Sequence, residues 1–319
     1  MSAPIVPAAT TAFPTWIDGR LHAPGLARVS TDDTGFQLGL AVFETLLYED
    51  ACLYDVAAHL ARLEESARTI GIEWPLAWDV ARVLDEYVRA LENRSAAIRV
   101  TLTRGAPSLV PSLVPSLVPS LVPSLVPSLV PSLVPSLVIG ARAIVRPADP
   151  GVVVVVAHET CVEPGPLAGV KSTNRLGYVL AREAAQRAGA FDALLCGAGN
   201  EVVEGTISNV FALVDGVVVT PGRERGCLAG TMRAVILDEL ARARRPVAIG
   251  RLTLTDLARA REMFLSNTTG RVIPIVEVRA VAGSLPGSRG ALVQDLRARL
   301  AARAAAYRQS VRTAARAAD

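Results

Sequence analysis

The chain contains 319 residues with a formal net charge of +3, and 51% of them are hydrophobic. This composition is typical of a globular protein of about two domains, and the small, dispersed charge does not favour a nucleic-acid or membrane-surface partner. No stretch of about 18 apolar residues is free of proline or charge, so we expect no membrane span. The N-terminal residues carry no basic segment followed by an apolar one, and we therefore expect a cytoplasmic protein.

The cysteines and histidines do not form the pattern of a metal site. The four cysteines lack CxxC spacing, and the three histidines lie far apart in the sequence, whereas zinc sites use pairs of closely spaced ligands. We expect free thiols in a reducing compartment and no bound metal.

The N-terminal half contains both predicted strands and a predicted helix. Residues 36–48 end in an apolar run typical of a strand, and apolar residues recur at helical spacing over 56–70. Residues 97–104 and 141–146 are expected to be two further strands. Mixed elements of this kind predict an α+β unit.

A repeat separates the last two of these strands. Residues 107–138 are eight consecutive copies of Pro-Ser-Leu-Val. A proline at every fourth position removes backbone donors and biases its predecessor toward extended conformations, so we expect neither a helix nor a central strand. The repeat is expected to be a loop or disordered, and we interpret it as a tandem expansion within that loop.

The C-terminal half follows a candidate linker at residues 147–150. Five valines at 152–156 predict a fully buried strand, and an apolar helix face begins at Leu176. Two predicted hairpins follow, the second with Asp-Gly at its turn, and another helix is expected to begin near Gly230. Hairpins with helices between them favour two α+β domains over a doubly wound parallel sheet. The expected division is a small N-terminal domain (1–146, with the repeat at 107–138), a linker (147–150), a larger domain (151–285) and a C-terminal helix and tail (286–319).

The positive charges are unevenly chosen. Of 33 basic residues only one, Lys171, is a lysine. Arginine stays protonated, whereas a lysine amine can lose its proton and form an imine. Lys171 is therefore either a chance survivor or a position where arginine fails chemically.

Pyridoxal phosphate (PLP) is a cofactor whose needs several residues of this chain could meet. It requires an amine, an anion near its pyridine nitrogen, donors for its phosphate and packing on its ring. Lys171 could supply the amine, and Glu204, at the end of a predicted strand, the anion. The helix expected after Gly230 could hold the phosphate at its N-terminus. For Glu204 alone, an ordinary turn residue is the simpler interpretation.

The order of these pieces resembles the fold-type IV PLP enzymes. This group includes branched-chain aminotransferases, D-amino-acid aminotransferases and 4-amino-4-deoxychorismate lyase. The strings that carry the resemblance, in chain order, are GLAVFETL, HLARLEESA, LTRG, KSTNRL, FDALL, VVEGTISNVF, TPGRERGCLAGTMR and FLSNTTGRVIPI. The resemblance implies a two-domain D-amino-acid aminotransferase-like fold, with the repeat inserted in a small-domain loop, and PLP as cofactor.

The resemblance also implies roles for individual residues. Lys171 would form the Schiff base with PLP and then move a proton between the substrate's Cα and the cofactor's C4′. Glu204 would contact the pyridine nitrogen, and Leu228 would pack on the ring. The phosphate would be bound by Arg62, the backbone amides of Thr231 and Met232, and the Thr268 hydroxyl. Without the resemblance, a solvated helix arginine is the preferred interpretation of Arg62, and a turn or helix-cap residue is that of Thr268.

The substrate contacts are expected from the small domain. Arg104 ends a strand there and is the candidate for a substrate carboxylate, with a surface salt bridge as the rival interpretation. The resemblance places substrate-touching side chains in the loop after LTRG, which in this chain is the repeat.

Two activities remain open. The first is transamination between an amino acid and a 2-oxo acid; the second is the lyase reaction on aminodeoxychorismate, which releases 4-aminobenzoate and pyruvate. LAGVKSTNRL favours the lyase, because branched-chain enzymes usually have a tyrosine at the position of Arg175. VVEGTISNVF and SNTTGRVIPI resemble the D-amino-acid aminotransferases equally well, so we predict a transaminase and keep the lyase as the alternative. A catalytically inactive scaffold is a third hypothesis, against which the retained Lys171 argues. The resemblance further implies a homodimer with each active site near the interface.

Overall fold

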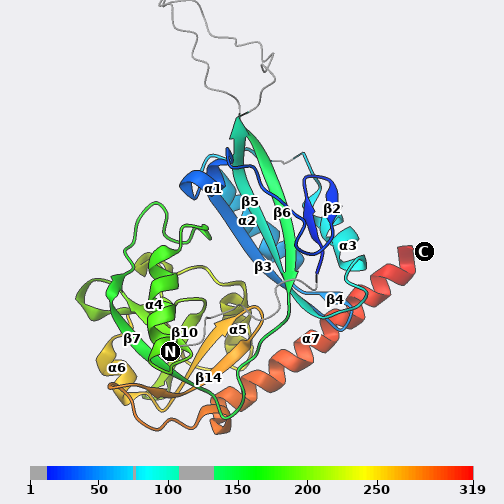
Figure 1. Ribbon diagram of the computed structural model, residues 1–319. Helices are drawn as coiled ribbons and strands as arrows, with labels where there is room; N and C mark the ends of the chain where they lie inside the picture. The colour runs from blue at the N-terminus through cyan, green and yellow to red at the C-terminus, as the bar shows by residue number, and fades with distance from the viewer. Residues whose placement is uncertain (1–12, 75–76, 108–132, 319) are drawn as a thin grey trace, which may run out of the picture.

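The computed structural model describes residues 13–74, 77–107 and 133–318, and its strands form two sheets (Figure 1). The first sheet has the order β2-β1-β6-β5-β3-β4, and all of its neighbouring strands are antiparallel. Its strands are β1 (Thr15–Ile17), β2 (Arg20–His22), β3 (Ala41–Glu49), β4 (Cys52–Leu53), β5 (Ala96–Pro107) and β6 (Leu133–Arg142). β3 and β5 confirm two of the predicted strands. The strand expected over 141–146 is wrong beyond its first two residues, because β6 ends at Arg142.

Two helices cover one face of this sheet. The apolar spacing predicted over 56–70 gives α2 (Val56–Thr69), and α3 (Val80–Arg89) follows it. Leu63 and Ala67 of α2 pack with Leu84 and Tyr87 of α3 on buried side chains of the strands. A short helix, α1 (Thr34–Leu38), leads into β3. One face of the first sheet is therefore closed by its own helices.

The end of the repeat differs from the expectation of a loop. Residues 133–138 form the start of β6 and pair with β5, and Pro107 ends β5. The register shifts between Thr103 and Ala106, so that Pro135 falls at an irregularity where the ladder does not need its missing N–H. Gly105 permits this irregularity, since it has φ +94° and a Cβ there would lie 1.7 Å from the Val134 carbonyl oxygen. Residues 108–132 of the repeat lie outside the described residues.

The second sheet is mixed and has the order β12-β11-β10-β13-β14-β7-β8-β9. Three neighbouring pairs, β11/β12, β14/β7 and β7/β8, are parallel. The predicted hairpins are confirmed, as β8/β9 and β10/β11. The strands are β7 (Val152–Cys161), β8 (Asp192–Cys196), β9 (Val202–Gly205), β10 (Asn209–Val214), β11 (Val217–Pro221), β12 (Val247–Gly250), β13 (Glu262–Asn267) and β14 (Arg271–Val278).

Helices lie on the second sheet and around its edges. They are α4 (Leu176–Arg187), α5 (Thr231–Arg242), α6 (Leu254–Arg259) and α7 (Ala291–Ala318), with 3-10 turns η1 (Ala198–Asn200), η2 (Arg223–Arg225) and η3 (Gly287–Arg289). Stacked Phe211 and Phe264 form the centre of the core beneath α5 and α7. None of the helices within the described ranges has the length and apolar character needed to cross a membrane.

One burial expectation for this half is wrong. The valines of β7 alternate, with Val152 and Val154 buried and the intervening Val153 only half-buried, because both faces of the strand are not equally covered. The apolar face of α4 that begins at Leu176 points outward: Leu176 is 72% exposed, whereas Ala181 and Ala185 on the other side are buried.

Helix α7 connects the two sheets. It leaves the second sheet and extends toward the first (Figure 1). There Tyr307 stacks on Tyr54 with ring centroids 5.5 Å apart, and Arg308 binds Asp50 at 2.8 Å. The division into domains at 147–150 remains a proposal, and β6 and β7 flank that segment.

Candidate active site

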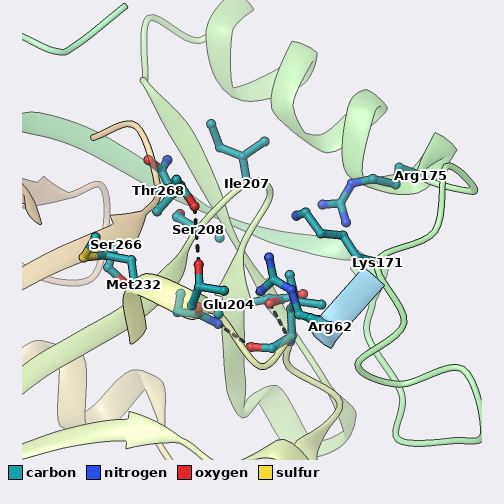
Figure 2. A pocket seen from close by; sticks show the side chains of 15 residues that line it. Arg62, Lys171, Arg175, Glu204, Ile207, Ser208, Met232, Ser266 and Thr268 are labelled. Carbon is teal, nitrogen blue, oxygen red and sulfur yellow. Dashed lines mark hydrogen bonds between the residues drawn. The ribbon is translucent and has the colours of Figure 1, made fainter. Parts of the chain in front are cut away.

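A pocket gathers most of the predicted site residues (Figure 2). They come from α2, the loop before α4, strand β9 and the N-terminus of α5. The lining residues are Arg62, Lys171, Arg175, Glu204, Gly205, Ile207, Ser208, Asn209, Leu228, Gly230, Thr231, Met232, Ser266, Asn267 and Thr268. Segments more than 200 residues apart in sequence therefore meet at one point.

Lys171 is held by its backbone, which leaves its side chain free to enter the pocket. Its carbonyl accepts a hydrogen bond from the Phe43 amide at 2.8 Å, and its amide donates to the Ser66 hydroxyl at 3.3 Å. The ammonium lies 4.7 Å from the centroid of the Phe43 ring. Burial, and then the nearby Arg62 guanidinium, lowers the pKa of Lys171 to about 7. A large fraction of this amine is therefore neutral, and nucleophilic, at neutral pH.

Glu204 is a buried carboxylate in the same pocket. Its oxygens accept hydrogen bonds from the Leu228 amide at 2.9 Å and the Tyr178 hydroxyl at 3.1 Å. Burial raises the pKa of Glu204, and these two donors oppose that shift. A cationic ring nitrogen placed beside this carboxylate would favour its ionised form.

Arg62 points into the pocket from α2. Its Nε and Nη2 atoms donate to the two oxygens of Glu44 at 2.6 and 2.7 Å, and Nη1 donates to the Ala229 carbonyl at 2.7 Å. Since a guanidinium carries five N–H groups, two remain for a ligand among the described residues.

The N-terminus of α5 lies beside Arg62. Its N-cap, Gly230, provides no side-chain capping bond, so the first backbone N–H groups of the helix are available to an anion. The Thr231 hydroxyl lies 3.5 Å from that of Thr268, in the turn between β13 and β14. Ser266, which was not predicted, contributes a buried hydroxyl that has no hydrogen-bond partner in the described structure. These groups together suit a phosphate.

One predicted residue lies elsewhere. Arg104 does not line the pocket, and its guanidinium lies against Gly71 at the end of α2. Arg99, five residues earlier on β5, has its guanidinium 3.6 Å from the centroid of the Phe43 ring, which Lys171 also approaches. Arg99 does not line the pocket either, and it borders a separate hollow together with Thr101 and Arg142. Binding of a substrate carboxylate by Arg104 stays a prediction.

Arg175 was noted in the sequence but not predicted as a site residue. It donates to the Thr206 carbonyl and stacks 4.0 Å from the centroid of the Tyr178 ring, on the same side of the pocket as Lys171 (Figure 2). Its position directly after Lys-Ser-Thr-Asn was the available sequence signal. Arg99 had no such signal, because only the paired register of β3 and β5 places it near Phe43.

Comparison with known proteins agrees with this geometry. The model of the family described as amino-transferase class IV matches residues 41–278. The chain belongs to this family. Its members depend on PLP, and the residues of the pocket fit that cofactor: an amine, a buried carboxylate and an uncapped helix N-terminus with Arg62.

The relatives include both transaminases and a lyase. The chain is 31% identical to a putative branched-chain-amino-acid aminotransferase of Methanocaldococcus jannaschii, over 82% of this chain and 87% of that protein. It is 29% identical to a D-alanine aminotransferase of Listeria innocua, over 88% and 92%. Its fold matches the 4-amino-4-deoxychorismate lyase of Pseudomonas aeruginosa with a TM-score of 0.70 and 28% identity, over 90% and 97%. The chain is thus an enzyme of this family, and its particular reaction is a separate question.

Proposed function

We propose that this protein is a transaminase that moves an amino group between an amino acid and a 2-oxo acid. The observation that carries the proposal is the position of the Lys171 amine, with its pKa lowered to about 7, in one pocket with Glu204 and the uncapped α5 N-terminus. When bound, PLP supplies an electron sink for the negative charge that develops at the substrate's Cα.

Separate residues of the chain bind the cofactor's phosphate, contact its ring and transfer the proton. Arg62, the first amides of α5 at Thr231 and Met232, and the Thr268 hydroxyl would hold the phosphate. Glu204 would contact the pyridine nitrogen and Leu228 would pack on the ring. Lys171 would hold the cofactor through its amine and, as general base and acid, would move the proton of the substrate's Cα. Each of these roles requires only groups that line the same pocket.

We propose that Arg99 and Arg175 bind the substrate's carboxylates. The Arg99 guanidinium lies over the Phe43 ring, which Lys171 also approaches, and the Arg175 guanidinium lies over the Tyr178 ring. Burial, and then the charges of Arg142 and Arg175, lowers the pKa of Arg99 to about 10. A carboxylate placed between such cations gains charge-assisted hydrogen bonds.

Arg175 also supports the lyase as a second candidate. A cation at this position in the pocket suits a substrate that carries a further carboxylate, as aminodeoxychorismate does, better than a substrate with an apolar side chain. The transaminase and lyase proposals therefore differ in what Arg175 is expected to contact.

One series of experiments tests both candidates. Borohydride reduction of the PLP-loaded protein should attach a phosphopyridoxyl group to the Lys171 peptide, and Lys171→Arg should abolish it, because arginine keeps the charge but forms no imine. Pairs of amino acids and oxo acids should then be assayed, followed by aminodeoxychorismate alone. Formation of 4-aminobenzoate and pyruvate without an oxo-acid acceptor would replace the transaminase with the lyase, and protein that takes up no PLP would refute both.

A further inference from the structure

Glu44 is a carboxylate with no exposed surface, beneath the pocket on strand β3. Its two oxygens accept from Nε and Nη2 of Arg62, and one of them also contacts Nδ1 of His59 at 2.7 Å. These charged hydrogen bonds outweigh the cost of burial and lower the pKa of Glu44 to about 2, so it stays ionised. A permanent negative charge therefore lies directly behind the group proposed to bind a phosphate.

On electrostatic grounds alone this charge is unfavourable, because it repels the phosphate dianion. Glu44 can instead serve to orient the Arg62 side chain. Arg62 also borders a groove between α2 and α5 that is lined by the carboxylates of Asp55 and Glu65. Without Glu44, the guanidinium could turn toward those acids, whereas the side-on pair with Glu44 leaves its remaining N–H groups directed into the pocket.

His59 extends this support to the second phosphate-binding element. Its Nδ1 faces Glu44, and its Nε2 lies 3.4 Å from the hydroxyl of Thr231, the first residue of α5. Arg62 contacts the same segment through the Ala229 carbonyl. One buried carboxylate is thus connected to the α2 arginine and, through His59, to the N-terminus of α5.

We propose that Glu44, together with His59, is a positioning residue that orients Arg62 and Thr231 toward the phosphate of the cofactor. The inference rests on the proposed function in one respect, the binding of that phosphate by Arg62. Glu44 contacts neither cofactor nor substrate, and acts through the two side chains that it holds.

Binding of PLP and of pyridoxal, which lacks the phosphate, to the apoprotein separates positioning from other roles. The readout is the dissociation constant of pyridoxal divided by that of PLP, both measured by absorbance titration, so that a high ratio means a strong preference for PLP. A general loss of structure, or a change at Lys171, affects both ligands and cancels in this ratio. If Glu44 acted only by its charge, Glu44→Gln would strengthen PLP binding; if it positions Arg62, the PLP preference should fall at least about tenfold, the loss expected for one charge-assisted hydrogen bond.

Matched variants complete the test. His59→Asn keeps an amide donor near Glu44 but removes the atom that faces Thr231, and it should lower the ratio less than Glu44→Gln does. It also decides the question if Glu44→Gln does not fold. Glu49→Gln is the control, since Glu49 lies on the same strand and pairs with Arg146 and Arg271, and its ratio should equal that of the wild type.

The double variant identifies the residue through which Glu44 acts. In an Arg62→Ala background, Glu44→Gln should change the ratio no further. An unchanged or higher PLP preference in both Glu44→Gln and His59→Asn would overturn the positioning role. If Arg62→Ala alone left the ratio unchanged, the phosphate assignment of Arg62 itself would fail, and the role of Glu44 with it.

Discussion

Lys171 owes its reactivity to its surroundings. Burial and the neighbouring Arg62 guanidinium both disfavour the ammonium form. The Glu44 and Glu204 carboxylates favour it, but their effects are smaller. The apoprotein therefore contains a partly neutral amine at a pH at which an exposed lysine would be almost fully protonated.

This environment predicts a particular pH dependence. In the apoprotein, acetylation of Lys171, followed by peptide mass spectrometry, should be half-maximal near pH 7, and in urea-unfolded protein the midpoint should return to about 10.4. Between these two values the unfolded chain binds more protons at this residue than the folded chain. The free energy of unfolding of the apoprotein should therefore rise with pH across this window. A native midpoint near 10 would contradict the pocket described here.

Individual site residues were predictable to the extent that they lie within continuous strings of sequence. Lys171 and Glu204 both line the pocket as expected. Arg104 lies outside this pocket, and the strand face that it occupies depends on register and on the irregularity at Gly105, neither of which a single sequence reveals. Glu44 and His59 were missed because their importance lies in contacts with each other and with Arg62.

At the scale of elements, the start of α5 depends on a close approach. A Cβ on Gly230 would lie 2.0 Å from Oδ1 of Asn209, whose amide is itself bonded to the Leu228 carbonyl. Gly230→Ala should displace the first turn of α5 and weaken PLP binding by about tenfold, since charged hydrogen bonds to its amides are lost. Gly250→Ala is the control, because no atom lies within 4 Å of a Cβ at that position. Equal PLP affinity in the two variants would argue against phosphate binding at this helix.

Shortening the repeat, in contrast, should leave cofactor binding unchanged. Deletion of residues 111–130 removes five copies of Pro-Ser-Leu-Val and leaves every described pair between β5 and β6 intact. PLP binding should be unchanged. If the segment is the loop that its sequence predicts, closing a shorter loop should raise the free energy of unfolding by roughly 1 kcal/mol. Titration with PLP and urea unfolding check both results, and loss of cofactor binding would show that the repeat supports the site.

The type and order of most elements followed from periodicity and turn residues, as in α2 and the Asp-Gly hairpin of β10 and β11. Burial was harder to predict. The outward face of α4 carries the apolar spacing of a packed helix, and nothing in a single chain's sequence distinguishes an internal core from a surface that another molecule could cover.

For the whole molecule, we propose a homodimer. Leu176, Val179 and Leu180 on α4 are all exposed, as is Ile207, which also lines the pocket. Apolar side chains gathered beside a binding site indicate an interaction surface. Leu180→Glu should shift the sedimentation coefficient from dimer toward monomer and lower activity, whereas Ile249→Glu, an exposed apolar position on β12, should do neither. Wild-type protein that sediments as a monomer would refute the proposal.

The choice of arginine for every other cation has a practical consequence for the molecule as a reagent. The ion pairs on its surface, such as Arg68 with Glu64 and Arg187 with Glu183, contain no primary amine. Supports and dyes that react with amines can therefore couple only to the chain's terminal amine and to Lys171. If Lys171 holds the cofactor as proposed, the cofactor-loaded enzyme should attach to an aldehyde-activated surface through its terminal amine alone.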